Sequence, residues 1–283
     1  MRALPATVLA ACGLIASACG DAGSGGAAAG QAVPATAAGQ SSTSPAPAKK
    51  AGKQAAKEAP PEAKPLDGRV VVVDPGHNGG NYRDPKAVNR KVNVLTQWKA
   101  CDTTGTSTND GYSEAAFTWD VSKRLVKILE GRGATVKLTR TSNDGVGPCI
   151  TERAAIGNKA EADAAISVHA DGSAPGHHGF HVIMPKKIDG PVDKVVGASK
   201  RLGLSVRDAF RAGTGLAYST YIGDKALNYR SDLGGLNLST VPKIFVEAGN
   251  MRNAAEAAKF RDPKFRQRIA VALANGLQHY LQA

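Results

Sequence analysis

The stretch Arg69-Val70-Val71-Val72-Val73-Asp74-Pro75-Gly76-His77 decides the fold that the rest of the chain has to complete. Four consecutive valines lack the alternation of a half-exposed strand, and such a β-branched run is typical of a strand buried on both faces of a parallel sheet. Pro75-Gly76 is a turn signal, so we expect the strand to end there. His77 therefore follows the carboxyl end of a predicted central strand.

Two further apolar segments end in a polar side chain in the same way. Ile166-Ser167-Val168 is followed by His169, and Phe245-Val246 is followed by Glu247. Ligands of open α/β sheets collect just beyond the carboxyl ends of the strands. We therefore expect His77, His169 and Glu247 to converge in one crevice. Glu114, at the start of a predicted helix, lies on the same side if that helix returns from the first strand.

The alternation of strands and helices along the chain predicts the fold class. We expect strands at 69–74, 135–139, 164–168, 179–184 and 243–246, and helices at 114–129, 151–158, 192–210 and from Asp262-Pro263 onwards. This order is typical of an α/β fold, here a single domain over residues 66–283 with a mainly parallel twisted sheet flanked by helices on both faces. Polar, glycine-rich residues 78–111 are expected to form a long loop over one end of the sheet.

The first 65 residues differ in composition from the predicted domain. Residues 1–18 combine a positive start with a short apolar run, which is typical of an export signal peptide. The small residues before Cys19 resemble the lipobox of bacterial lipoproteins, in which the cysteine thiol carries a lipid anchor. The alternative is an ordinary cleavage site at Ala16-Ser17-Ala18 with free release. Residues 19–65, rich in Ala, Pro, Gly and Lys, are predicted to form a disordered tether.

The net charge of the chain and its predicted export limit the binding partners that are expected. The chain has a net charge of +12, which suits an anionic surface such as a cell wall or a membrane. We expect an exported protein at the outer face of the cytoplasmic membrane or in the wall, held to the membrane only through the lipid anchor. No nucleic-acid-binding motif is present in the sequence, so no nucleic-acid partner is expected. A monomer is the default expectation for the domain.

Export also permits disulfide bonds. Cys101 and Cys149 fall in the predicted domain, and they have no C-x-x-C spacing, so a zinc ribbon is not indicated. A Cys101–Cys149 disulfide is the favoured interpretation, and in the chain-entropy model it would stabilise the domain by about 3–4 kcal/mol. The alternative is a pair of unbridged buried thiols.

The residues at the predicted strand ends suit metal-assisted hydrolysis. Two imidazoles and one carboxylate are a common catalytic zinc set that leaves a fourth position open. A second carboxylate that is not a ligand can take a proton from water and return it to a leaving amine. Two His and two Glu are therefore the minimum for hydrolysing an amide in this way. A rival cluster of His177, His178 and His181 straddles a glycine-rich turn, and a surface or groove-wall role is favoured for it.

Three segments together carry a resemblance to a known family. Val72-Val73-Asp74-Pro75-Gly76-His77, Ile166-Ser167-Val168-His169-Ala170-Asp171 and Val246-Glu247-Ala248-Gly249 are similar to the signatures of the amidase 3 family, the zinc-dependent N-acetylmuramoyl-L-alanine amidases. The resemblance implies one zinc ion bound by His77, Glu114 and His169, with Glu247 as general base and acid. It also implies peptidoglycan as the substrate, cut at the amide between N-acetylmuramic acid and the L-Ala of the stem peptide.

Several alternatives stay open at this point. The same zinc set would serve a peptidase that cuts within the stem peptide. An anchored wall-binding protein without catalysis would have no need for both Glu114 and Glu247. Asp74 and Asp171 either orient the histidines or serve turn chemistry. Arg230, Asp232 and residues 233–236 either line the groove for the stem peptide or form a polar loop.

Overall fold

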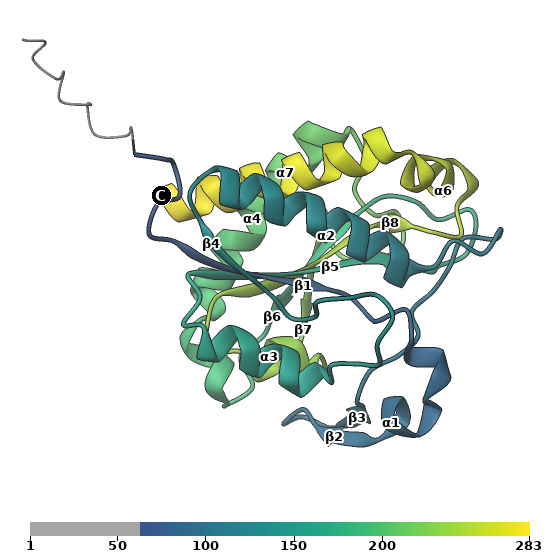
Figure 1. Cartoon of the computed structure of the whole chain (residues 1–283), viewed down its shortest axis with the longest axis horizontal. Helices are drawn as coiled ribbons and strands as arrows, with labels where there is room; N and C mark the ends of the chain where they lie inside the picture. Colours follow the sequence, from purple (N-terminus) through teal and green to yellow (C-terminus); the bar gives the residue numbers. More distant parts are fainter. Residues whose placement is uncertain (1–62) are drawn as a thin grey trace, which may run out of the picture. The chain divides into compact units, whose positions relative to one another are not determined.

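The computed structural model describes residues 63–283 (Figure 1). The predicted signal peptide, the predicted lipidation site Cys19 and the predicted tether up to residue 62 lie outside the described residues. The six-stranded sheet has the order β4-β1-β5-β8-β6-β7, and all neighbours are parallel except β6 and β8. Its strands are β1 (Val70–Pro75), β4 (Thr135–Leu138), β5 (Ala164–Asp171), β6 (His181–Pro185), β7 (Leu227–Arg230) and β8 (Lys243–Asn250). The predicted α/β fold with a mainly parallel sheet is confirmed.

The valine run explains why β1 is an inner strand. Val71 and Val73 have no exposed surface and pack in the large core cluster with the apolar faces of helices on one side of the sheet. Val72 is also fully buried, but it packs on the opposite face with Ala165 and Val241. Both faces of the strand are therefore covered, as a continuous apolar run requires.

Helices cover the two faces of the sheet (Figure 1). One layer holds α2 (Glu114–Gly131), α4 (Val196–Thr214) and α7 (Pro263–Gln282), with α6 (Ala254–Arg261) beside it; the other holds α3 (Ile150–Lys159) and α5 (Gly234–Asn237). Ser113 caps α2, because its Oγ accepts a hydrogen bond from the Ala116 amide at 3.3 Å. Asp262 likewise caps α7 through the Lys264 amide at 2.8 Å. The first residue of α2 is thereby fixed as Glu114.

The prediction of one long loop over residues 78–111 was wrong. This segment holds a 3-10 helix (Asn81–Arg83), α1 (Pro85–Asn89) and a hairpin of β2 (Lys91–Asn93) and β3 (Trp98–Ala100). These elements are only three to five residues long, so they leave no periodic signal in the sequence. They are held by a small cluster of their own, in which Val92 and Val94 pack against Cys101, Cys149 and Ile150.

Both cysteines of the domain lie in that cluster. Cys101 and Cys149 are buried and carry free thiols in the structure. Burial, and then the neighbouring Cys149, raise the pKa of the Cys101 thiol to about 12. Because the two side chains share one cluster, the Cys101–Cys149 disulfide stays a prediction for the oxidised protein.

The two ends of the described domain meet at one edge of the fold. The Leu66 amide donates a hydrogen bond to the carbonyl oxygen of Arg132 at 2.8 Å. The side-chain amide of Gln282 donates one to the carbonyl oxygen of Pro65 at 3.2 Å. Leu66 precedes β1 and Arg132 precedes β4, so this edge lies at the amino ends of the parallel strands. Over residues 63–283, no helix combines the length and the apolar character needed to cross a bilayer.

Candidate metal centre and active-site groove

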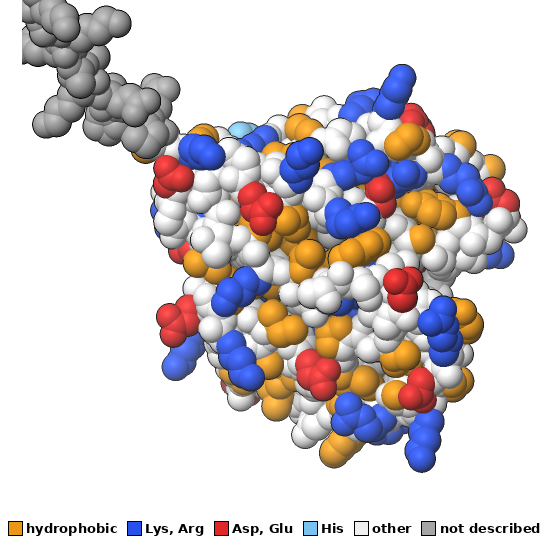
Figure 2. Space-filling view, in the orientation of Figure 1, with side chains coloured by type: hydrophobic (Ala, Val, Ile, Leu, Met, Phe, Trp, Pro, Cys, Tyr) orange, Lys and Arg blue, Asp and Glu red, His pale blue; other side chains and the backbone are white. Residues whose placement is uncertain are grey.

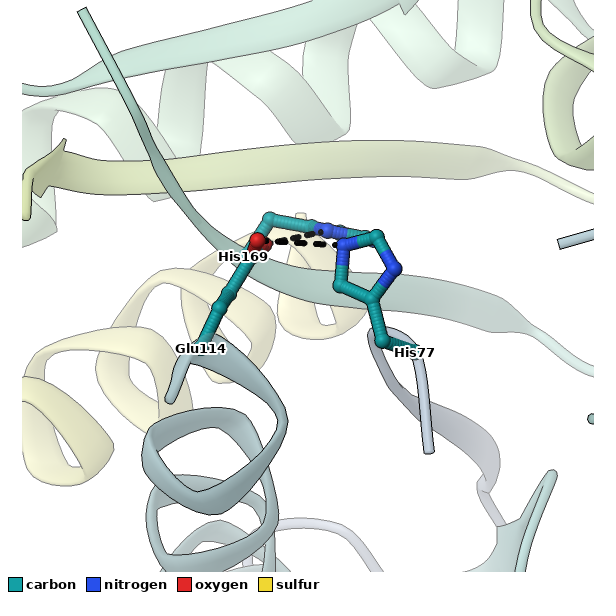
Figure 3. A group of neighbouring side chains, drawn as sticks. All are labelled: His77, Glu114 and His169. Atoms are coloured by element: carbon teal, nitrogen blue, oxygen red, sulfur yellow. Dashed lines mark hydrogen bonds and ion pairs between the residues drawn. The ribbon is translucent and has the colours of Figure 1, made fainter. Parts of the chain in front are cut away.

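Three side chains from separate elements meet at the carboxyl ends of the strands (Figure 3). His77 follows β1, Glu114 opens α2 and His169 lies in β5. The Glu114 carboxylate lies between the two rings, with Oε2 3.1 Å from His77 Nε2 and Oε1 2.9 Å from His169 Nδ1. One ligand atom from each residue lies within 4.8 Å of the others. The structure thus brings together the three residues that the sequence singled out as metal ligands.

Glycines give the two imidazole rings their space. A Cβ at Gly76 would lie 2.3 Å from the His169 ring, so only glycine fits beneath that ring. A Cβ at Gly105 would come within 2.7 Å of the His77 ring and 2.8 Å of the Glu114 carboxylate. The Pro75-Gly76 turn signal therefore has a second role, since it lets the chain pass close to the neighbouring strand.

The backbone of His77 and its outer contacts fix the direction of its ring. His77 has a φ of 56°, in the left-handed region that residues other than glycine seldom adopt. Its Nδ1 lies 3.1 Å from the carbonyl oxygen of Thr103 and 3.6 Å from Asp102 Oδ1. Because both neighbours accept hydrogen bonds, Nδ1 carries a proton, and Nε2 is the ring nitrogen that faces Glu114.

In the metal-free protein, His77, Glu114 and their neighbours shift one another's pKa. Burial lowers the pKa of His77, but Glu114 and then Asp102 outweigh it, and the pKa rises to about 10. Burial raises the pKa of Glu114, but His77 and His169 outweigh it, and the carboxyl pKa falls well below its usual range. Two imidazole nitrogens and one carboxylate are a donor set that fits zinc. A divalent cation at this position would replace the bound proton as the partner of Glu114.

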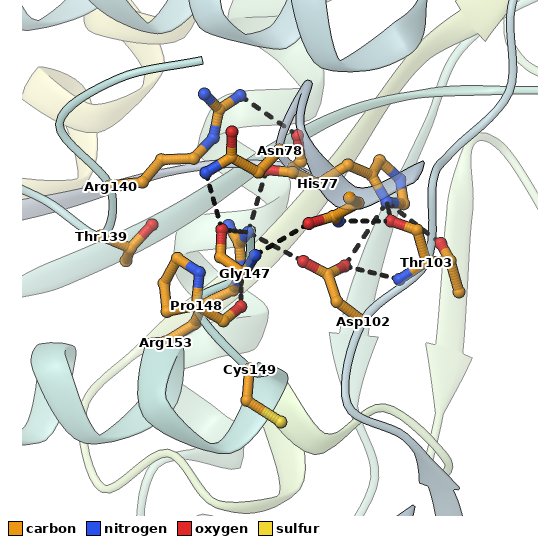
Figure 4. A network of polar contacts seen from close by, with 12 residues as sticks. His77, Asn78, Asp102, Thr103, Thr139, Arg140, Gly147, Pro148, Cys149 and Arg153 are labelled. Carbon is orange, nitrogen blue, oxygen red and sulfur yellow. Dashed lines mark hydrogen bonds and ion pairs between the residues drawn. The ribbon is translucent and has the colours of Figure 1, made fainter. Parts of the chain in front are cut away.

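A buried charge network supports the centre from below (Figure 4). Arg153 lies 2.8 Å from Asp74 and 3.1 Å from Asp102, and it donates to the carbonyl oxygen of His77 at 2.9 Å. Asp102 therefore connects His77 to Arg153. Sequence reasoning missed Asp102, because it lies in an irregular segment and no motif marks it. Its contact with His77 depends on how residues 78–111 fold.

The two aspartates considered as partners of the histidines have other contacts. Asp74 accepts from Lys243 at 3.1 Å and from the Ser167 hydroxyl at 2.8 Å, besides its ion pair with Arg153. Asp171 accepts a hydrogen bond from the Tyr221 hydroxyl at 3.0 Å. Neither makes a hydrogen bond to a histidine of the centre in the described part of the chain. Asp74 instead holds the strands and Arg153 in place.

Glu247 faces the same groove from β8. Its Cα is paired with that of His169 across the β5–β8 ladder, so the register places it beside the centre. Its Oε2 is buried and has no hydrogen-bond partner among the described residues. Burial, and then the charges of Glu114 and Asp171, raise its pKa well above the usual range. A carboxyl group in this setting is suited to hold and pass on a proton.

The groove around the centre has two parts. One has a volume of about 420 Å³ and is lined by the three candidate ligands together with Glu247, Arg230 and Leu233. The adjoining part, about 180 Å³, shares His77, His169 and Phe245 and is bounded by Ala100, Ile150 and residues 233–235. Arg230 and the Leu233–Gly235 segment thus belong to the groove wall.

The rival histidine cluster does not come together as a metal site. His177 lies 2.8 Å from the Ser173 hydroxyl and stacks on Tyr221 with ring centroids 5.1 Å apart. His181 is buried, and burial lowers its pKa to about 4. In the part of the chain that the structure describes, the candidate metal-binding group is His77, Glu114 and His169.

Known proteins are similar to this chain in both sequence and architecture. The sequence model of the Amidase 3 family, described as N-acetylmuramoyl-L-alanine amidase, matches residues 71–279. The N-acetylmuramoyl-L-alanine amidase Rv3717 of Mycobacterium tuberculosis is 39% identical over 218 residues, which are 76% of this chain and 88% of that protein. The crystal structure of the amidase Ami1 from Mycobacterium abscessus has a TM-score of 0.72 at 41% identity, covering 76% of this chain and 100% of that one. Ami1 from Mycobacterium smegmatis gives a TM-score of 0.72 at 37% identity, with coverages of 76% and 98%.

Proposed function

Because the chain belongs to the amidase 3 family of N-acetylmuramoyl-L-alanine amidases, we propose that one zinc ion is its cofactor in peptidoglycan hydrolysis. The bond cut is the amide between N-acetylmuramic acid and the L-Ala of the stem peptide. His77, Glu114 and His169 would hold the ion, and Glu247 would be the general base and acid. The convergence of these four side chains at the carboxyl ends of β1, β5 and β8 carries the proposal.

The protein's own residues perform separate tasks in this reaction. The contacts of His77 Nδ1 with Thr103 and Asp102 keep its Nε2 lone pair available to a cation. Zinc, when bound, supplies Lewis acidity that lowers the pKa of a water molecule towards about 7. Glu247 takes the proton of the attacking water at its carboxylate and then delivers it to the leaving nitrogen of L-Ala. Its buried position favours the protonated form once the proton has been transferred.

The surface charge supports an anionic wall as the working environment. Figure 2 shows Lys and Arg side chains gathered over the helical layer of α2 and α7. Lys123 and Lys127 of α2, and Lys264 and Arg268 of α7, are exposed. We place the protein outside the cytoplasmic membrane, in or next to the wall, after removal of residues 1–18 and with Cys19 as the proposed lipid attachment site. We propose that it acts as a monomer.

The test is product analysis on bacterial peptidoglycan. The purified protein is incubated with the wall polymer alone, with a chelator, and with zinc added back, and the released products are weighed by mass spectrometry. Stem peptides that begin with L-Ala, absent after chelation and restored by zinc, are the expected result. Shortened stems still attached to muramic acid would replace the amidase with a peptidase, and a lack of products would favour a wall-binding role.

The role of Glu247 has its own prediction. The Glu247→Gln variant keeps the shape of the side chain but removes the base, so we expect turnover to fall by about 10²–10⁴-fold. Zinc content, measured by atomic absorption, should equal that of the wild type because Glu247 is not a ligand in this assignment. An active variant, or one that no longer binds zinc, would contradict the assigned role.

A further inference from the structure

In the larger part of the groove, which holds the three candidate ligands and Glu247, Arg230 is the single Lys or Arg side chain among the lining residues that the structure describes. It is the last residue of β7, on the edge strand of the sheet. The acidic side chains Glu114, Asp171 and Glu247 line the same groove. A lone cation in an acidic groove would be satisfied by pairing with one of these carboxylates, yet Glu247 Oε2 has no hydrogen-bond partner. The guanidinium of Arg230 therefore pairs with a carboxylate other than that of Glu247.

Asp232 holds the guanidinium in a fixed position. Arg230 Nε lies 2.7 Å from one carboxylate oxygen of Asp232, and Nη2 lies 2.6 Å from the other. Lys99, on the β2–β3 hairpin, approaches the same carboxylate at 3.1 Å. Two cations thus share one anion, which leaves one positive charge unmatched within the group.

The segments that carry Lys99 and Asp232 are held to the domain by hydrogen bonds. The side-chain amide of Asn237 in α5 donates to the carbonyl oxygens of Val94 and Ser231, at 2.8 Å each. The Thr96 hydroxyl of the hairpin turn donates to the same Ser231 carbonyl at 2.7 Å. The hairpin, the segment after β7 and α5 are therefore tied together, and the guanidinium does not depend on a substrate for its orientation.

The edge of Arg230 that is left open suits a carboxylate. Its Nη1 makes no hydrogen bond within residues 63–283, while the side chain keeps 34% of its surface exposed. A planar guanidinium with free donors binds carboxylates through short, charge-assisted hydrogen bonds. The stem peptide that is released as the leaving group carries carboxylates, whereas the sugar hydroxyls of the glycan are neutral.

We propose that Arg230 binds a carboxylate of the stem peptide and so makes the enzyme select anionic stems. The inference deepens the amidase function proposed above and rests on it. In this arrangement Asp232 is a positioning residue, because it acts on the substrate only through Arg230.

A matched pair of soluble substrates tests this proposal. Each is an N-acetylmuramoyl-L-alanyl peptide, and the two differ only in whether the carboxylate of the second amino acid is free or amidated. We expect Arg230→Gln to raise KM on the free-carboxylate substrate by about 10- to 100-fold, since a charge-assisted hydrogen bond is lost. On the amidated substrate the ratio of variant to wild-type KM should fall towards one. Repeating the pair with each further stem carboxylate amidated identifies which carboxylate is bound.

Control variants distinguish carboxylate binding by Arg230 from a general effect on folding or activity. Arg207, which pairs with Asp208 at 2.8 Å on α4 outside the groove, gives the matched variant Arg207→Gln, expected to behave as the wild type on both substrates. Arg230→Lys keeps the charge but not the planar donors, so an intermediate KM is expected, and circular dichroism checks that each variant is folded. Equal losses on every substrate, or no loss on any, would overturn the proposal. A wild-type protein that cleaves none of them would instead refute the amidase function.

Discussion

The groove is bordered by two groups of charges that have the same composition but different surroundings. The first, which we call the floor, consists of Asp74 with Arg153 at 2.8 Å and Lys243 at 3.1 Å. The second, which we call the wall, consists of Asp232 with Arg230 at 2.6 Å and Lys99 at 3.1 Å. Each group is one aspartate shared by an arginine and a lysine, so chemistry alone does not distinguish them.

Burial separates their roles. The side chains of the floor group are 2–5% exposed, whereas those of the wall group are 31–34% exposed. A buried charge that loses its partner cannot be hydrated, so the floor is a structural element on which the positions of β1, β5 and β8 depend. The wall group is hydrated in either state, and its charges are available to a ligand.

The largest expected effect is on stability, in the floor. Asp74→Asn leaves Lys243 and Arg153 buried with one counter-charge fewer, and we expect a loss of about 3–5 kcal/mol in the free energy of unfolding. Urea denaturation followed by circular dichroism measures it. Lys243 and then Arg153 hold the pKa of Asp74 well below its usual range against the effect of burial, so this stabilisation is present above about pH 4 and is lost as the pH falls further. A cost below 1 kcal/mol would remove the distinction between floor and wall.

A smaller effect is expected where the floor meets the metal centre. Asp102→Asn removes the carboxylate that lies near His77 Nδ1, and comparable outer-shell changes weaken metal binding by about 10–100-fold. Competition with a chromophoric chelator measures the zinc affinity. Asp110→Asn is the matched control, because Asp110 pairs with Arg261 away from the centre. Equal zinc affinities for the two variants would contradict the role given to Asp102.

The dependence of zinc binding on pH comes next. The pKa of His77 is about 10 in the metal-free protein, so below that pH a proton must leave before Nε2 can bind a cation. The apparent zinc affinity should therefore rise by about tenfold per pH unit between pH 7 and 9. Calorimetry in buffers with different ionisation enthalpies counts the released protons. An affinity that is constant over this range would show that His77 is already neutral.

The smallest effect is expected in the wall. Asp232→Asn removes a partly hydrated ion pair, so the free energy of unfolding should change by less than about 1 kcal/mol. The same variant leaves Arg230 charged but no longer held, and KM for a stem with a free carboxylate should rise less than in Arg230→Gln. Thermal unfolding and steady-state kinetics on one preparation give both values. A stability loss as large as that of Asp74→Asn would show that the two groups are equivalent.

The strand ends that carry the site could largely be predicted from the sequence, whereas the partners of its charged side chains could not. The valine run, the strand ends and the caps at Ser113 and Asp262 all depend on local patterns, so the positions of His77, His169 and Glu247 at one edge of the sheet followed from them. The same reasoning missed β7 and α6. It also placed the start of α4 four residues too early, since Pro191–Lys194 form a 3-10 helix.

The features that the sequence did not predict, Asp102 and the partners that orient Arg230, depend on contacts between distant segments. Asp102 reaches His77 only because residues 78–111 fold onto Cys149 and Ile150. Arg230 is held by Asp232, and Asp232 also pairs with Lys99, which lies more than 130 residues away in the chain. Side chains of this kind follow no periodicity, and their partners are fixed only when the sheet and the hairpin are both in place.

The meeting of Pro65 with Gln282, at the amino ends of the strands, determines how the enzyme can be attached to a support. The groove opens at the carboxyl ends of the same strands. A linker joined at either end of the domain therefore leaves from the side facing away from the substrate. Immobilised through such a linker, the domain would present its groove outwards, towards a polymer that is too large to diffuse around it.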